Sequence, residues 1–221
     1  MRLSVVINTC CLGPRAHEIT GSWTFTPHAL RAYSLGNFIL PFYRADASID
    51  EILVAGEFVE GEGYRYVPCP STHFSCIDAL AQRQAAFEAA TGDVIVFHHD
   101  DHMIDYTFAA KLKTADMTKV DVILPERRRR TMGGHEVLNN GGKDGYISGH
   151  CVVMTREACE KAPWNAVQHV FEWDVSHTRL IAAAGLRALH TDLIWCWDVE
   201  VGGAHERPAI WEEREDPKEL V

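Results

Sequence analysis

The chain lacks the features that would tie it to a membrane, a disulfide framework or a nucleic-acid backbone. No apolar run approaches the roughly 20 residues needed to cross a bilayer, and no signal-peptide apolar segment follows the first residues. The 7 cysteines contain no CxxC pair, which argues against a zinc ribbon. Only 21 Lys and Arg stand against 31 Asp and Glu, which argues against a general polyanion binder. We therefore expect a cytoplasmic protein with reduced thiols and no membrane anchor.

A chain of 221 residues with 47% hydrophobic content is long enough to bury a sizeable core in one large domain. Apolar runs bounded by Gly, Pro and polar clusters predict buried strands. These runs are residues 3–7, 51–55, 64–67, 94–97, 120–124, 146–154 and 193–197. Amphipathic or capped segments predict helices that begin at Ser75, Thr107, Thr155 and Asp174, and a further helix is expected over residues 27–35. We expect Gly92 and Gly185 to end two of these helices.

Strands that alternate with helices at this spacing predict an α/β fold with a mainly parallel, Rossmann-like sheet flanked by helices. In such sheets, ligands bind beyond the carboxyl ends of the strands. The sequence HHDDH, residues 98–102, falls at such an end.

The segment 98–102 places charged side chains directly after an apolar strand. In an extended backbone His99 and Asp101 share one face, whereas His98 and Asp100 share the other. Adjacent carboxylates repel each other, and a divalent cation would relieve that repulsion. Carboxylate oxygens suit Mg²⁺ or Mn²⁺, and an imidazole ligand shifts the preference toward Mn²⁺. Zinc and a solvated loop without metal remain open as alternatives.

The stretch RQAAFEAATGDVIVFHHDD resembles a segment of GT-A glycosyltransferases of the family-2-like group. There, a helix carrying an arginine leads through Thr-Gly-Asp into a strand and the Asp-x-Asp metal motif. Arg83 and Asp93 lie at the family's arginine and Gly-Asp positions. LSVVINT looks like the first nucleotide-binding strand, with Thr9 near its end, and EILVAGEF looks like the second, with Glu57 as the nearest acid. The resemblance implies that these residues contact the donor.

Two later segments extend the resemblance over most of the chain. DGYISGHCVVMTREACEKA is similar to the family's glycine-containing strand and the helix after it. FEWDVSHTRLIAAAGLR is similar to its acidic motif and the following helix, although the usual Glu-Asp pair is replaced by Trp173-Asp174 and Glu172 lies one place upstream. The resemblance implies a single GT-A-like domain over residues 1–205, followed by a charged tail, 206–221. Its nucleotide-sugar half would span about 1–103 and its acceptor half about 104–205.

The metal motif departs from the family's pattern. Its positions read His99-Asp100-Asp101, which is a His-x-Asp motif, or an Asp-x-His motif if Asp100 and His102 are counted. We expect Asp101 to be the first ligand and Asp100 the second, with His99 or His102 completing the set. Asp100 is also counted among the donor-binding residues.

The family's C-terminal metal-binding histidine would fall near Trp197-Asp198, where no histidine stands. Asp198, His190 and His205 are the candidates to replace it. The resemblance implies a Mn²⁺ or Mg²⁺ cofactor.

The resemblance also implies transfer of a sugar from a nucleotide-sugar donor, with UDP- and GDP-sugars expected, to an acceptor hydroxyl. An inverting enzyme needs a carboxylate to take the proton of that hydroxyl. Asp174 is our candidate base, and the role of Glu172 is open. An equally good interpretation is that Asp174 is a structural residue in the first turn of a helix, stabilised there by the helix dipole.

Four consecutive arginines follow Glu126, and they cannot all share one face. A solvated loop is one interpretation. The other is that Arg127, Arg128 or Arg129 contacts the donor diphosphate or a phosphorylated acceptor, because Arg binds phosphate through a bidentate fork. The acceptor is a glycan, a small molecule or, as a less favoured option, a nucleic acid. Trp173 is expected either to stack on an acceptor sugar or to lie in the core.

Three other functions compete with sugar transfer. A His/Asp metallohydrolase would need further ligands, for which His135, His150, His190 and His205 are available. A non-catalytic module that binds nucleotide-sugars or glycans would account for the departures from the motifs. A sugar nucleotidyltransferase would want a Gly-rich basic loop after the first strand, and NTCCLGPR is a poor match to one.

Overall fold

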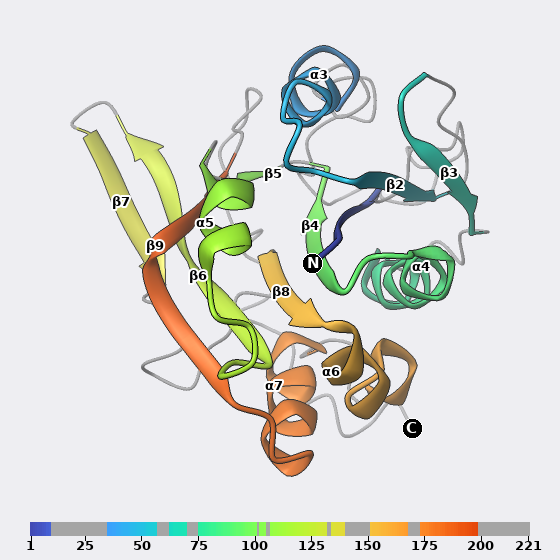
Figure 1. The fold of residues 1–221 in the computed structure, drawn as a ribbon, viewed down its shortest axis with the longest axis vertical. Coiled ribbons are helices and arrows are strands. Elements are labelled where there is room, and N and C mark those ends of the chain that lie inside the picture. The colour runs from blue at the N-terminus through green and yellow to red at the C-terminus, as the bar shows by residue number, and fades with distance from the viewer. Residues whose placement is uncertain are drawn as a thin grey trace, which may run out of the picture.

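A single mixed sheet organises the computed structural model, which describes residues 1–9, 35–56, 62–69, 75–100, 102–104, 107–131, 134–139, 151–167 and 173–198. The sheet of these residues has nine strands in the order β3-β2-β1-β4-β8-β6-β9-β5, and β7 pairs with β6 (Figure 1). Their bounds are β1 Leu3–Asn8, β2 Glu51–Gly56, β3 Arg65–Pro68, β4 Val94–His99, β5 His102–Ile104, β6 Val122–Thr131, β7 Gly134–Asn139, β8 Cys151–Thr155 and β9 Ala188–Asp198.

The first four strands of that order run parallel to one another. β8 is antiparallel to β4 and to β6, whereas β9 is parallel to β6. β5 returns antiparallel to β9. The carboxyl ends of β1, β2, β4, β6 and β9 therefore meet at one edge of the sheet, together with the start of β5. This arrangement is the mainly parallel α/β fold expected from the sequence.

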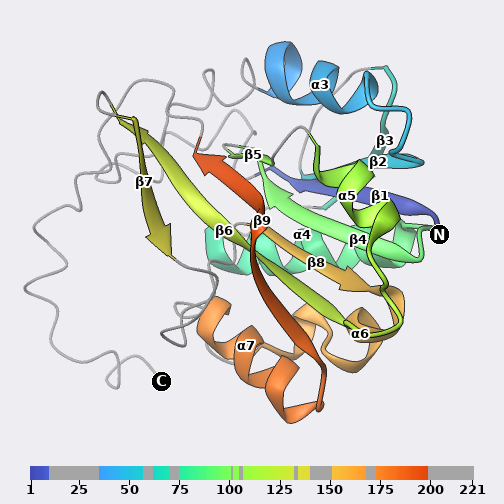
Figure 2. The same cartoon turned by 60° about the vertical axis from the view of Figure 1, so that its left-hand side comes forward.

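Helices cover both faces of the sheet (Figures 1 and 2). One face carries the larger set, which packs with Trp164 and Phe87 into one hydrophobic cluster. The other face carries a second cluster that includes Tyr43 and Phe108. The helices of the first face are α4 Ser75–Ala89, α6 Arg156–Lys161, the 3₁₀ turn η2 Trp164–Ala166 and α7 Trp173–Ala183; those of the second are η1 Leu35–Ile39, α3 Leu40–Arg44 and α5 Phe108–Thr114. No helix of the described residues is long and apolar enough to span a membrane.

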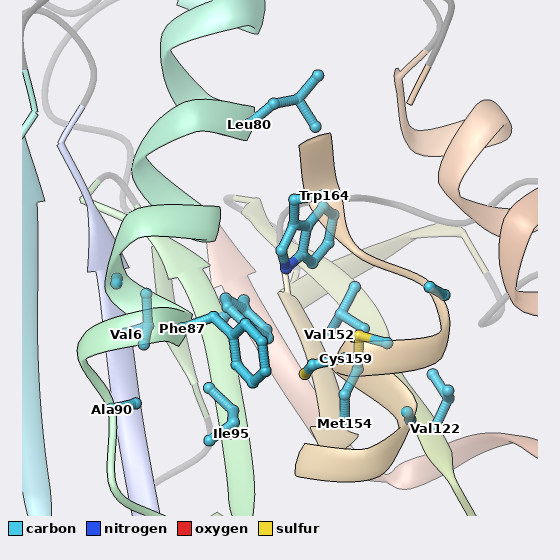
Figure 3. Close-up of a cluster of buried hydrophobic side chains, with 14 of the residues drawn as sticks. Val6, Leu80, Phe87, Ala90, Ile95, Val122, Val152, Met154, Cys159 and Trp164 are labelled. Atoms are coloured by element: carbon cyan, nitrogen blue, oxygen red, sulfur yellow. The ribbon is translucent and has the colours of Figure 1, made fainter. Parts of the chain in front are cut away.

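Trp164 is the largest fully buried side chain of the first cluster and joins η2 to α4, β4 and α7 (Figure 3). Its ring lies edge-on to Phe97 of β4 at 5.1 Å and stacks on His177 of α7 at 3.7 Å. The His177 ring nitrogen Nε2 lies 3.0 Å from the carbonyl oxygen of Ala162 and donates to it. Burial is the main reason that the pKa of His177 falls to about 4, and the charge of Arg83 lowers it further.

Two predicted helix ends are confirmed and one is not. Thr155 caps α6, because its hydroxyl accepts a hydrogen bond from the Ala158 amide at 3.2 Å. Gly185 follows α7 with φ 66°, a left-handed conformation that favours glycine. Gly92, however, has no positive φ. A Cβ atom there would lie 2.5 Å from Ser4 Oγ and 2.8 Å from Ser4 N, so this glycine lets β4 start close against β1.

The four arginines lie in a strand and not in a loop. β6 continues from Val122 through Arg127–Arg130 to Thr131 and pairs with β7 on one side and β9 on the other (Figure 2). The segment 134–139, for which no strand was predicted, forms β7. Backbone pairing outweighs the unfavourable composition here, because β-structure depends on neighbouring strands more than on local propensity.

Candidate functional site

The candidate site begins where β1 and β4 end side by side. Asn8 and His99 are register partners on these parallel strands. Asn8, Thr9 and Asp100 are fully buried, and His99 is 7% exposed. Buried polar groups need partners, so their hydrogen bonds define the architecture of this edge.

A chain of hydrogen bonds joins three of these elements. Arg83 Nε donates to Asn8 Oδ1 at 3.0 Å. The Asn8 amide nitrogen Nδ2 lies 2.7 Å from His99 Nδ1. Helix α4, strand β1 and strand β4 are thereby linked through side chains just below the carboxyl edge.

Arg83, predicted to contact the donor, is 0% exposed and lies among aromatic rings. Its guanidinium carbon is 4.7 Å from the ring centroid of Trp164, 4.8 Å from that of Trp173 and 6.0 Å from that of Phe97. The negative faces of these rings attract the cation, and their bulk excludes water. Arg83 is thus buried on the α4 side of β1, and its hydrogen bond to Asn8 connects it indirectly to His99.

His98 and His99 point to opposite faces of the sheet, as the alternation predicts. The His98 ring lies 5.1 Å from that of Tyr43, on the α3 side. The His99 ring lies 5.9 Å from that of Trp173, on the α7 side. Tyr43 also accepts a hydrogen bond from the Ile104 amide through its hydroxyl at 3.3 Å, and so connects α3 to β5.

Thr9, the predicted donor contact at the end of β1, is anchored to β2. Its amide and its hydroxyl both donate to the carbonyl of Ala55 at 2.9 Å. The neighbouring Gly56 allows this approach, because a Cβ there would lie 1.9 Å from Thr9 Oγ1. Thr9 is thus fixed at the carboxyl edge. Glu57, the other predicted donor contact on this side, lies outside the described residues.

The first turn of α7 reaches the same place. Trp173 is its first residue, and the ring contacts with His99 and Arg83 bring the start of the helix to the end of β4. Asp174 follows at once, and its Oδ1 accepts a hydrogen bond from the Val175 amide at 2.9 Å. This contact suits a first-turn aspartate, and the role of Asp174 as a base stays a prediction. Glu172 falls outside the described residues.

The strand register aligns three of the remaining candidates. His102 of β5 is the partner of Asp198 of β9, and Asp198 is in turn the partner of Arg129 of β6. Arg128 pairs with Trp197, and Arg127 pairs with Cys196. The backbone thus brings predicted cation ligands and predicted phosphate contacts, distant in the sequence, to one level of the sheet.

Asp93, predicted to contact the donor, lies apart from the residues at the carboxyl edge. It precedes β4, whereas Asp100 follows it, so the two lie roughly 20 Å apart. The Asp93 carboxylate accepts a hydrogen bond from the Arg2 amide at 2.7 Å and lies 3.8 Å from the N-terminal amine. Its contacts are structural and hold the start of β1.

The predicted cation ligands fall partly within the described residues. Among the described side chains, no group of three or more His, Cys, Asp or Glu residues is arranged to hold a metal ion. Asp101 and His205 lie outside the described residues, and of His102 and Asp198 only the backbone is described. His190 lies near the start of β9, at the opposite end of that strand from Asp198, which removes it as a ligand at the carboxyl edge.

Three contributors to the site were missed in the sequence. Asn8 was not singled out, although a polar amide at the end of an apolar strand is a signal for a buried hydrogen-bonding role. Trp164 and Tyr43 carried no signal, since their contacts with Arg83 and His98 depend on tertiary packing.

No model of a known protein family matches the chain, and no curated protein sequence matches it. Solved structures do share its fold. The mannosyltransferase PcManGT from Pyrobaculum calidifontis, in complex with GDP-Man and Mn²⁺, is 18% identical with a TM-score of 0.56, covering 95% of this chain and 59% of that one. S. aureus TarS 1-349 in complex with UDP-GlcNAc is 13% identical with a TM-score of 0.52, covering 93% and 60%. A197 from STIV is 12% identical with a TM-score of 0.50, covering 89% and 84%.

The chain thus spans about 60% of the length of the PcManGT and TarS chains. At these identities the similarity concerns the fold. That fold is the GT-A-type, Rossmann-like arrangement expected from the sequence.

Proposed function

We propose that this protein is a divalent-cation-dependent glycosyltransferase that transfers a sugar from a nucleotide-sugar donor to an acceptor hydroxyl. The observation that carries the proposal is the convergence of Asn8, Thr9, His99 and Asp100 at the carboxyl edge of β1 and β4, the edge where parallel α/β sheets bind ligands. PcManGT and TarS, which share the fold, were solved with GDP-Man and UDP-GlcNAc. We therefore propose a UDP- or GDP-sugar as donor.

Mn²⁺ or Mg²⁺ would be held by Asp101, with His102 and Asp198 as further ligands and Asp100 beside them. The pairing of His102 with Asp198 directly after Asp100 and Asp101 in the chain supports this set. Carboxylate oxygens with one imidazole suit Mn²⁺. Such a cation, when bound, neutralises negative charge on a departing diphosphate.

The chain's own residues would do the remaining work. The acceptor oxygen forms a bond to the anomeric carbon while the bond from that carbon to the diphosphate oxygen breaks. Asp174 would accept the hydroxyl proton at its carboxylate, an arrangement that inverts the anomeric configuration. Arg127, Arg128 and Arg129 are proposed contacts for the diphosphate or a phosphorylated acceptor, and Trp173 for an acceptor sugar ring.

The test is a thermal-shift panel of nucleotide-sugars with and without Mn²⁺ or Mg²⁺. A ligand that binds the native state stabilises it by RT ln(1 + [L]/Kd), so the melting temperature rises as the ligand concentration exceeds Kd. We expect one UDP- or GDP-sugar to stabilise the protein only when the cation is present, and Asp101→Ala to abolish this shift. Asp174→Asn should retain the shift and lose transfer.

Other outcomes would favour other functions. Stabilisation by Zn²⁺ alone, with no response to any nucleotide, would replace the proposal with a His/Asp metallohydrolase. Donor binding without turnover on a panel of glycan and small-molecule acceptors would indicate a binding module. An Asp174→Asn variant with the full transfer rate would remove Asp174 as the base.

A further inference from the structure

We infer that Arg83 and Asn8 lock His99 in the tautomer that carries its proton on Nε2, so that His99 is a hydrogen-bond donor at the site and not a cation ligand. The tautomer follows from the hydrogen bonds alone. Only its consequence for the cation rests on the proposed function. Of the two histidines that could complete the cation ligands, His99 and His102, this leaves His102.

The first step is the chemistry of Arg83. A guanidinium has N–H donors and no acceptor, and it stays protonated in proteins. Its Nε lies 3.0 Å from the Asn8 side chain, so the Asn8 atom on that side must be the amide oxygen. If the Asn8 amide were turned over, its NH₂ group would face the N–H of Arg83 Nε, and neither group could accept a hydrogen bond.

The second step follows from the geometry of the amide. With Oδ1 toward Arg83, the NH₂ group of Asn8 faces Nδ1 of His99 at 2.7 Å. An amide NH₂ only donates, so His99 Nδ1 must accept through its lone pair. A neutral imidazole carries one proton, and that proton is therefore on Nε2.

The third step concerns what His99 can bind. A cation binds a ring nitrogen through a lone pair. The lone pair of Nδ1 is taken by Asn8, and Nε2 carries a hydrogen. Binding through Nε2 would move the proton to Nδ1 and reverse the Asn8 amide, which would break its bond to Arg83.

Packing makes that reversal costly. Asn8 and Arg83 are 0% exposed and His99 is 7% exposed. The guanidinium carbon lies over two indole rings, 4.7 Å from the ring centroid of Trp164 and 4.8 Å from that of Trp173. If the hydrogen bond between Arg83 and Asn8 were broken, no solvent would be available to replace it at either side chain. Arg83 and Asn8 are thus positioning residues that act through His99.

The tautomer is measured by long-range ¹H–¹⁵N correlation spectra of histidine-labelled protein without metal or nucleotide. His99→Gln identifies the His99 signals among the 12 histidines. We expect the shift of an unprotonated nitrogen at Nδ1 and of a protonated nitrogen at Nε2. A protonated Nδ1 in the wild-type protein would overturn the inference.

Co²⁺ titration calorimetry on the same proteins tests the consequence. His99→Gln should keep the Co²⁺ affinity within about twofold, whereas Asp101→Ala should lose it. Asn8→Asp offers acceptor oxygens to both Arg83 and His99, so it should move the proton to Nδ1 and raise Co²⁺ affinity by about tenfold. Asn8→Asp combined with His99→Gln keeps the added charge and removes the imidazole, so the gain should shrink in the double variant.

A loss of Co²⁺ affinity of tenfold or more in His99→Gln would contradict the inference, and so would an equal gain in Asn8→Asp with and without His99. The spectra need no donor, so they separate the two proposals. An unprotonated Nδ1 in a protein that binds no nucleotide-sugar would refute the proposed function and leave the tautomer assignment in place.

Discussion

At the residue scale, the feature with the largest energetic cost is the buried positive charge of Arg83. A charge taken out of water is costly unless hydrogen bonds and nearby electron-rich groups replace its hydration. Asn8 and the faces of Trp164 and Trp173 provide part of that replacement. Because the same guanidinium orients Asn8, stability and the arrangement of the site depend on one side chain.

Arg83→Lys should therefore destabilise the protein by about 2–4 kcal/mol, although it keeps the charge. An ammonium group lacks the planar guanidinium that lies over both indole rings and donates to Asn8. Urea unfolding measures the change. Arg65→Lys is the matched control, since Arg65 is half-exposed and pairs with Glu51 at 2.9 Å, and we expect a loss below about 1 kcal/mol. Equal small losses in both variants would show that the burial of Arg83 is not important to folding.

The sequence was informative about residues that lie close together in the chain and less so about their partners. The segment 98–102 identified the edge of the site, because a cluster of ionisable residues directly after an apolar strand is typical of the ligand-binding edge of an α/β sheet. The asparagine that orients His99 is 91 residues away. Which side chains meet across β1, β4 and α4 depends on packing, and packing leaves no local pattern. The resemblance of Asp93 to a family position likewise does not specify which end of the strand binds the ligand.

At the element scale, the junction of β1 and β4 depends on a glycine that was expected to end a helix. Gly92→Ala should destabilise the protein by about 1–3 kcal/mol, because the added methyl group would meet the backbone of Ser4 and Arg2. Gly36→Ala is the control, since a Cβ there meets no atom within 4 Å. Denaturant midpoints measure both changes. If the two variants were equally stable, the close approach of β4 to β1 would be in doubt.

His177 makes the contact of α7 with η2 sensitive to pH. Its folded pKa of about 4 lies below the ordinary 6.5, so unfolding takes up a proton at intermediate pH. The stabilisation is complete above pH 6.5 and is lost as pH falls toward 4, by roughly 1.4 kcal/mol per pH unit. Urea unfolding of wild type and His177→Phe at pH 7 and pH 4.5 should give a smaller loss in the variant. Parallel losses would show that His177 is protonated without penalty in the folded state.

Elements with a strong local signal were predicted well, and elements defined by pairing were not. The strand over 94–97, the helix from Ser75 and the Thr155 cap are all present. Strands β5 and β7 and the extension of β6 through its arginines escaped prediction, because charged and glycine-rich segments become strands only when neighbouring strands supply hydrogen bonds.

At the scale of the whole molecule, one sheet contains strands from both the earlier and the later half of the chain. β4 is joined through β8 to β6 and β9, so the ends of strands from both halves meet at a common edge. The alternation of strands and helices was sufficient to predict this class of fold. The order of the strands in the sheet could not be predicted from the sequence, because it depends on pairing between segments that are distant in the chain. That order is what brings Asp198 beside His102.

The most direct measurement is titration calorimetry of the stabilising nucleotide-sugar in Mn²⁺, comparing wild type, Asp101→Asn and Asp93→Asn. Asp93 precedes β4 in the sequence and Asp101 follows it, so the comparison tests which end of that strand binds the donor. We predict that Asp101→Asn abolishes Mn²⁺-dependent binding and that Asp93→Asn leaves the affinity unchanged. Equal binding by Asp101→Asn and wild type, or its loss in Asp93→Asn alone, would contradict a donor site at the carboxyl edge.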